Sequence, residues 1–322
     1  MTASVENGLA PAAESAVAGE AIVTEAVATE GVQTPFRRFV SDFCESKVAV
    51  GALAVFLAIL FVAVTAPWIS PTDPYDLATV DVMDSRLAPG ETSFDGSVTY
   101  WLGTDGSGRD LLSAMFYGLR TSLGVGVMSG LIALLLGTAV GLTSAYYGGR
   151  VDAFIMRVVD IQLSFPAILV ALVLLAILGK GVDKIIIALI IVQWAYYART
   201  VRGSALVERR REYVEAATCL ALPPRRILFR HLLPNCLPPL IVVGTVETAR
   251  AISLEATLSF LGVGLPVTEP SLGLLISNGF EYMLSGKYWI SIFPGVALLI
   301  TIVSINLVGD QLRDVLNPRL ER

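Results

Sequence analysis

The sequence predicts an all-α membrane protein with six transmembrane helices. Of its 322 residues, 54% are hydrophobic and only 16% are charged, whereas charged residues make up about 25% of an ordinary soluble domain. The mean hydropathy is +0.69, and long runs without charge recur along the chain. This composition excludes a disordered chain, a fibrous chain and almost any cytosolic enzyme.

The composition also argues against a metal site and against nucleic-acid binding. Three widely spaced cysteines and one histidine form no CxxC and no HxxxH pair, so no metal-ligand set is expected. The net charge is −5 and the pI is near 5.1, which gives no basic footprint for nucleic acid. We therefore expect no catalytic residue, no metal and no cofactor in this chain.

Six apolar segments have the length of a membrane span, which requires roughly 20 mostly apolar residues. Four of them carry no charge. The fourth span reaches full length if its terminal Lys184 and Arg199 extend to the interfaces, and the fifth contains Glu247 and Arg250. In chain order the expected spans cover residues 48–67, 121–149, 161–179, 185–198, 235–254 and 288–309.

The Lys and Arg residues predict that both termini are cytoplasmic. With the N-terminus inside, sixteen of the 23 cations lie on the inner side, six lie outside, and Arg250 falls within a span, which is a strong positive-inside bias. The chain then divides into a disordered cytoplasmic tail (1–35), an interfacial helix with the first span (36–67), an extracytoplasmic loop (68–120), a five-helix core (121–310) and a cytoplasmic tail (311–322).

The two N-terminal assignments rest on composition. The first 35 residues contain five glutamates and no Lys or Arg, as is typical of a disordered segment. Residues 36–43 form a short aromatic and basic stretch, which fits a helix lying along the membrane surface. A plain basic flank of the first span is the alternative.

The most charged part of the chain is residues 202–233, between the fourth and fifth spans. Pro223 and Pro224 predict a break between two short helices, because proline interrupts a helix but can begin one. The first helix would expose Tyr213, Glu215, Ala216 and Ala217. Two adjacent alanines have short side chains, so the groove of another protein can approach the helix backbone closely there.

This segment resembles the EAA signature of bacterial binding-protein-dependent ABC permeases, in which it forms a coupling helix that docks on an ATP-hydrolysing subunit. The family usually has glycine at the position of Ala221, and alanine costs on the order of 1 kcal/mol there if φ is positive. The resemblance assigns ATPase coupling to Tyr213, Glu215, Ala216, Ala217, Ala221, Leu233 and Pro234.

Three further stretches, at residues 101–113, 254–264 and 309–319, resemble the C-type permeases of dipeptide and oligopeptide importers. The resemblance covers residues 36–319, although the arginine that usually ends the first element is Ala114 here. It implies a type I ABC importer permease (MetI-like) fold in the bacterial inner membrane. The chain would translocate di- or oligopeptides by alternating access.

The implied partners are a second homologous permease, two ATP-binding subunits, an extracytoplasmic solute-binding protein and membrane lipid. No P-loop occurs in the chain, so ATP and magnesium would belong to the partner subunits. Another cargo, such as nickel, glutathione or a cationic peptide, is an alternative. A membrane-embedded enzyme and a proton-coupled secondary transporter are further alternatives.

Two groups of charged residues are candidate transport sites. Glu247 and Arg250 lie three residues apart near mid-bilayer, where charges cost several kcal/mol unless paired or hydrated. They form either an intrahelical pair or part of a wet pathway, and Glu255 is a further pathway candidate with a role in gating geometry. Outside the membrane, Asp105, Arg109 and Asp110 either fix a turn at the channel mouth or contact the binding protein.

Overall fold

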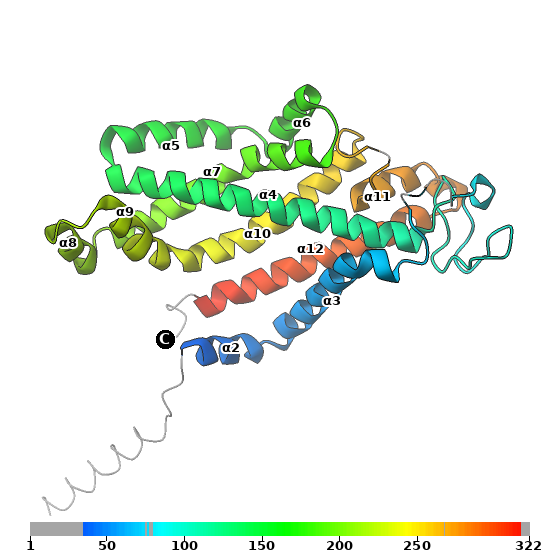
Figure 1. Ribbon diagram of the computed structural model, residues 1–322, viewed down its shortest axis with the longest axis horizontal. Coiled ribbons are helices and arrows are strands. Elements are labelled where there is room, and N and C mark those ends of the chain that lie inside the picture. Colours follow the sequence, from blue (N-terminus) through cyan, green and yellow to red (C-terminus); the bar gives the residue numbers. More distant parts are fainter. Residues whose placement is uncertain (1–34, 75, 77–79, 267, 317–322) are drawn as a thin grey trace, which may run out of the picture. The chain divides into compact units, whose positions relative to one another are not determined.

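The computed structural model describes residues 35–74, 76, 80–266 and 268–316 (Figure 1). Within these ranges the chain is nearly all helical, and β-structure is confined to two isolated bridges, Thr92 with Thr99 and Thr104 with Asp110. The longer helices are α2 (Pro35–Glu45), α3 (Lys47–Ile69), α4 (Leu111–Tyr147), α5 (Gly149–Ser164), α6 (Ala167–Leu178), α7 (Val182–Glu208), α8 (Glu212–Cys219), α10 (Leu233–Phe260), α11 (Leu272–Phe280) and α12 (Trp289–Leu316).

The described chain divides into two compact units, one ending at Glu45 and a second beginning at Ser46. The N-terminal unit contains α2, whose helical form agrees with the sequence prediction for residues 36–43. Arg38 and Asp42, four residues apart, form an ion pair at 3.9 Å. The location of α2 at the membrane surface stays a prediction. The predicted disordered tail, residues 1–34 in particular, lies outside the described residues.

Among the described residues, five helices of the second unit are long and apolar enough to cross a membrane, and a bent pair, α5 with α6, adds a sixth if it counts as one span. Several helices extend beyond the charge-free runs. Helix α4 begins at Leu111 rather than at residue 121, because Asp110 caps its first turn by accepting the Ser113 amide at 3.0 Å. Helix α12 continues to Leu316, past the predicted start of the C-terminal tail.

The third predicted span, residues 161–179, is wrong as a continuous helix. Helix α5 ends at Ser164, helix α6 begins at Ala167, and their axes meet at 90°. Pro166 explains the bend, since proline cannot continue a helix and forces the preceding residue into an extended conformation. Phe165 accordingly has φ −93° and ψ 140°.

Helices α4 and α7 pack backbone against backbone along a seam of glycines. A methyl group on Gly137 would lie 2.5 Å from the carbonyl oxygen of Trp194, and one on Gly141 would lie 2.5 Å from that of Ala198. Such distances are too short for any side chain, so only glycine permits this approach.

The long helices of this unit run back and forth between two ends (Figure 1). Helices α8 and α9 (Pro224–Arg226) lie at one end, where α12 also finishes. Helix α11 and the loop between α3 and α4 lie at the opposite end. This arrangement separates the EAA-like segment from the predicted extracytoplasmic loop by the length of the spans.

Candidate functional site

Helix α8 forms a corner between α7 and α10. Val214 and Ala217, three residues apart on one face, are both buried and join a hydrophobic cluster with Ile227 and Leu232. The end of α7 is fixed separately, because Arg209 donates from Nη1 to the Ala145 carbonyl oxygen of α4 at 2.9 Å. The corner is therefore a packed part of the fold.

The turn after α8 has the hydrogen bonds of a Schellman motif. The Ala221 amide donates to the Thr218 carbonyl at 2.9 Å, and the Leu222 amide donates to the Ala217 carbonyl at 3.2 Å. This motif requires a left-handed residue where Ala221 stands, and its φ is indeed +52°. Ala221 therefore stands where the family usually has glycine. It adopts the left-handed conformation, which is strained for alanine.

Tyr213 ties α8 to both neighbouring helices. Its hydroxyl donates to Glu208 Oε2 at 2.7 Å and accepts from Asn235 Nδ2 at 3.0 Å. Burial and the hydrogen bond to Glu208 raise the pKa of Tyr213 to about 12. Sequence reasoning missed Glu208 and Asn235, because they belong to the ends of two spans and only the fold brings them to the tyrosine.

The outer face of α8 presents Glu215 and Ala216, which are both exposed, and Leu220, which is 74% exposed. The prediction that Ala217 shares this face is wrong, since only 4% of its surface is accessible. Residues three positions apart lie on the same face of a helix. Ala217 therefore lies on the inner face of α8, together with the buried Val214. The face open to a partner is thus smaller than the motif suggests.

The second predicted short helix is not separate. After the break at Pro223, α9 continues through a π-helical turn (Ile227–Leu232) directly into α10. Proline at the first helical position starts this segment, as predicted. Leu233 is half-buried and Pro234 is exposed in the first turn of α10, so the end of the motif belongs to a span.

Glu247 and Arg250 form the predicted intrahelical ion pair, with Arg250 Nη1 at 2.7 Å from Glu247 Oε1. Glu247 is 3% exposed, whereas the Arg250 side chain is 49% exposed and lies over the Tyr196 ring at 5.0 Å. Among the described residues Glu247 Oε2 has no hydrogen-bond partner.

Both members of this pair line a cavity of ≈ 880 Å³ between α7, α10 and α12. Glu208, Asn235 and Arg313 line it further along. The pair is therefore both an internal salt bridge and part of a cavity wall, so the two alternatives from the sequence are compatible.

Glu255 lies elsewhere. It is 0% exposed, accepts hydrogen bonds from Ser122 of α4 at 2.8 Å and from Ser259 at 2.7 Å, and does not line that cavity. The carboxyl group joins α10 to α4, which is a structural contact between helices. The serines that hold it are a second feature that the sequence did not indicate.

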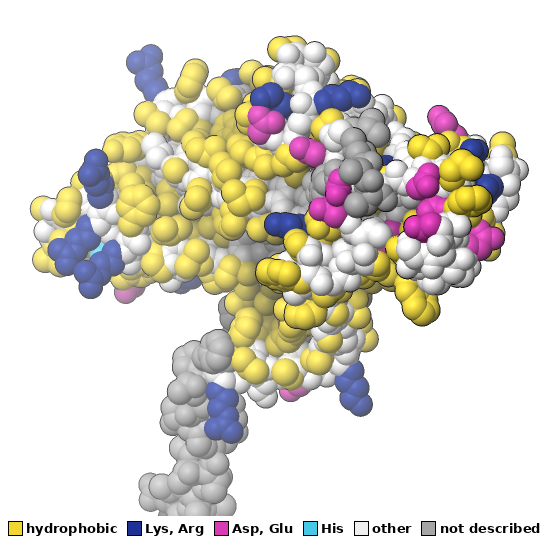
Figure 2. Space-filling view, turned by 45° about the vertical axis from the view of Figure 1, so that its right-hand side comes forward, with side chains coloured by type: hydrophobic (Ala, Val, Ile, Leu, Met, Phe, Trp, Pro, Cys, Tyr) yellow, Lys and Arg dark blue, Asp and Glu magenta, His cyan; other side chains and the backbone are white. Residues whose placement is uncertain are grey.

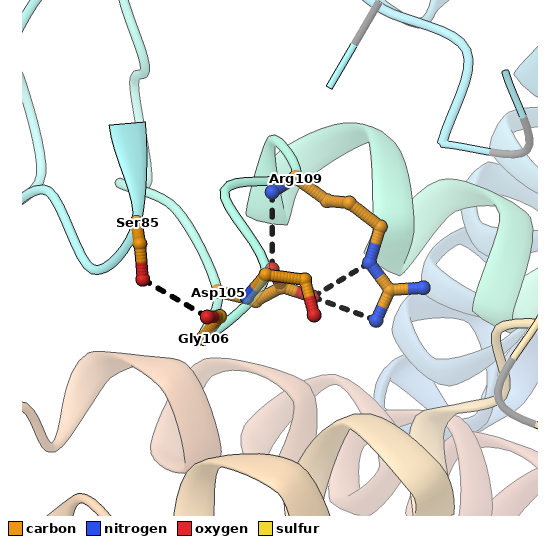
Figure 3. Close-up of polar contacts among 5 residues, drawn as sticks. Ser85, Asp105, Gly106 and Arg109 are labelled. Carbon is orange, nitrogen blue, oxygen red and sulfur yellow. Dashed lines mark hydrogen bonds and ion pairs between the residues drawn. The ribbon is translucent and has the colours of Figure 1, made fainter. Parts of the chain in front are cut away.

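Asp105, Arg109 and Asp110 are all buried. Arg109 donates from Nε to Asp105 Oδ2 at 2.8 Å (Figure 3). Asp105 Oδ1 also accepts the Ser107 and Arg109 amides. Asp110 caps α4. These contacts correspond to the turn-forming interpretation, because side chains occupied within their own loop present no surface to a binding protein.

Charge is distributed unevenly over the molecule. In Figure 2, hydrophobic side chains cover the middle, Lys and Arg gather around the single histidine at one end, and Asp and Glu gather at the other. Arg225, Arg226 and Arg230 are close to the single histidine, His231, in the sequence, and all three are exposed.

The family comparisons match two parts of the chain. Residues 133–322 match the model of the binding-protein-dependent transport system inner membrane component. Residues 34–89 match the N-terminal transmembrane domain of oligopeptide transport permease C.

Individual relatives match almost the whole chain. It is 37% identical to a di/tripeptide transport system permease protein, DppC, of Pseudomonas aeruginosa over 89% of this chain and 93% of the relative. It is 35% identical to a glutathione transport system permease protein, GsiD, of Pectobacterium atrosepticum over 90% of this chain and 93% of the relative.

The fold also matches a solved structure. An inward-facing form of the MetNI methionine ABC transporter is 20% identical, with a TM-score of 0.54 over 64% of this chain and 98% of that chain. At this identity the match supports the MetI-type fold alone. The sequence comparisons show that the chain belongs to the family of binding-protein-dependent transport system inner membrane components.

Proposed function

We propose that this chain is a permease subunit of an ATP-driven importer that carries short peptides inward by alternating access. The observation that carries the proposal is the α8 corner, which presents Glu215 and Ala216 outward while its inner face is packed against the spans. The outer face of α8 is held rigidly and is suited to a mechanical contact, because motion of a docked partner would be transmitted to α7 and α10. A permease with di/tripeptide in its name is among the relatives.

The proposed assembly contains a second, homologous permease, two ATP-binding subunits and an extracytoplasmic solute-binding protein. ATP and magnesium would bind to the ATP-binding subunits, and α8 would lie in a groove of one of them. This chain would then supply the pathway and the coupling contact, without covalent chemistry.

The cavity beside α10 is the proposed pathway. The half-exposed guanidinium of Arg250 would meet a peptide carboxylate, and the unpartnered Oε2 of Glu247 would accept a hydrogen bond from the peptide. The second permease would close the open side of this cavity. Both charges are already paired with each other, which lowers the cost of keeping them in the membrane between transport events.

Coupling is tested by ATP hydrolysis of the reconstituted complex, with and without loaded binding protein. A bulky residue on the docking face, as in Ala216→Trp, should abolish cargo stimulation and uptake while insertion stays normal, because overpacking of a close interface costs about 1–3 kcal/mol. Glu215→Lys should weaken the contact through charge inversion. Ala153→Trp is the matched control, since Ala153 is an exposed alanine on α5. Full stimulation in both α8 variants would reject α8 as the coupling helix.

Orientation is tested with the chain's own thiols. We propose that both termini and α8 are cytoplasmic, and Cys219 at the end of α8 is exposed. With Cys44 and Cys236 replaced by serine and Ser97→Cys added, an impermeant thiol reagent applied to intact cells should label residue 97 and spare Cys219. Labelling of Cys219 would reverse the proposed topology.

A glutathione importer is the second candidate, since the glutathione permease of Pectobacterium atrosepticum is also similar. Uptake of labelled dipeptide by the reconstituted complex, in competition with glutathione, separates the two. Complete competition by glutathione at equal concentration would favour that cargo.

A further inference from the structure

An apolar cavity of ≈ 530 Å³ lies apart from the proposed pathway, between α3, α4, α10 and α12. Its lining is almost wholly hydrophobic, and several lining side chains are exposed at its opening, including Leu131 and Leu135 of α4 and Leu237 and Ile241 of α10. It lies within spans of an inner-membrane protein, so its opening faces either lipid or another subunit.

One wall of this cavity is a stripe with a four-residue spacing. Phe229, Leu233, Leu237, Ile241 and Thr245 all line it, as expected for one face of a helix. Arg225 and Arg226 precede Phe229 in the sequence, and Arg230 follows it directly. Cations therefore flank the apolar stripe where the span ends.

Arg225, Arg226, Arg230 and His231 form the basic cluster, which lies at this end of the stripe in the sequence. The three arginines are exposed. No ion pair between residues that the structure describes involves them. Their charge is thus available to an anion at the level of the membrane surface.

We propose that this cavity and the basic cluster together bind one anionic phospholipid of the bilayer, with an acyl chain in the cavity and the phosphate on the arginines. Basic pockets at the ends of membrane helices recognise anionic head groups, and arginine suits the multidentate phosphate. A transmembrane helix of a neighbouring subunit would fill the apolar part alone, whereas an anionic phospholipid matches both parts with a single molecule. The inference does not depend on the proposed cargo.

The test measures lipid retained by the purified complete transporter, using native mass spectrometry after exposure to dioleoylphosphatidylglycerol or dioleoylphosphatidylcholine in detergent. The wild-type complex should retain the anionic lipid preferentially. Since each cation near the surface contributes on the order of fivefold to affinity, Arg226→Gln with Arg230→Gln should weaken phosphatidylglycerol binding by roughly 25-fold. Arg157→Gln, at an exposed arginine on α5, is the control and should have no effect.

The acyl-chain half is tested by filling the cavity. Gly244 lines it, and a Cβ there would meet nothing within 4 Å, so Gly244→Leu should fold while it blocks the chain. It should reduce retention of both lipids. Gly124→Leu is the matched control, because Gly124 is equally free of neighbours but does not line the cavity.

Two outcomes would overturn the proposal. One is equal retention of the two lipids by the wild-type complex. The other is unchanged phosphatidylglycerol retention in the double arginine variant, together with loss of the ATP-binding subunits during purification, which would assign the cluster to a protein interface.

Discussion

Replacing Ala221 with glycine should stabilise the α8 corner. Ala221 has φ +52°, and an L-residue in the left-handed region costs about 1–2 kcal/mol. Glycine avoids this cost but loses about 0.5–1 kcal/mol through the greater freedom of the unfolded chain. The Ala221 side chain is exposed, so no packing is lost. The net effect should be about 0.5–1 kcal/mol in favour of the folded turn.

Hydrogen exchange of the purified complex measures this difference locally, because amide protection reports the free energy of local opening. The informative amides are those of Ala221 and Leu222, which donate across the turn. After correction for intrinsic rates, the Leu222 amide should exchange roughly two to five times more slowly in Ala221→Gly.

The matched control is Ala216→Gly in the same helix. Ala216 is also exposed, but it has helical geometry within α8, where glycine costs about 1 kcal/mol. The same chemical change should therefore speed exchange in α8, roughly fivefold. If Ala221→Gly also speeds exchange or leaves it unchanged, the strain assigned to Ala221 does not exist.

The remaining predictions concern the corner and the ion pair. Ala217→Trp should lower the yield of the assembled complex rather than block docking, because Ala217 is buried in the chain's own cluster; normal yield would place it on the outer face. Arg250→Leu should lower yield more than Glu247→Leu, because it strands a buried carboxylate, and the double leucine variant should recover yield but not uptake; full uptake in all three would remove the pair from the pathway. The pKa of Tyr213 is raised to about 12, so the stability of the corner should be complete below about pH 10 and fall as the pH rises toward 12. Tyr213→Phe should abolish this pH dependence of the corner's stability, as measured by amide hydrogen exchange over a range of pH.

The spans were predictable because the bilayer imposes a length and a polarity that can be counted along the chain. The bend at Pro166 was not predicted, although the proline was visible, since a charge-free run passes through it. Helix ends were misplaced by about ten residues at Leu111. A polar cap such as Asp110 can begin a helix well before its apolar stretch.

The EAA-like segment was located correctly, but its exposed face was not. Orientation of Ala217 depends on the corner that α8 makes with two long helices, and the local sequence does not encode it. The family preference for glycine marked Ala221 as a position where φ could be positive, but the alanine left a looser or more helical turn open, and only the structure gives its φ of +52°. Contacts such as Glu208 with Tyr213, or Ser122 with Glu255, join residues of different helices and require the fold.

The glycine seam between α4 and α7 has a mechanical consequence. Two helices that touch through their backbones have no intervening side chains whose rotamers could absorb a sliding or rolling movement. Helices α4 and α7 should therefore behave as a single stiff lever, and any push received by α8 at the tip of α7 would swing both arms together. A Gly137→Ala change would insert a wedge at the middle of that lever and alter its angle rather than its strength.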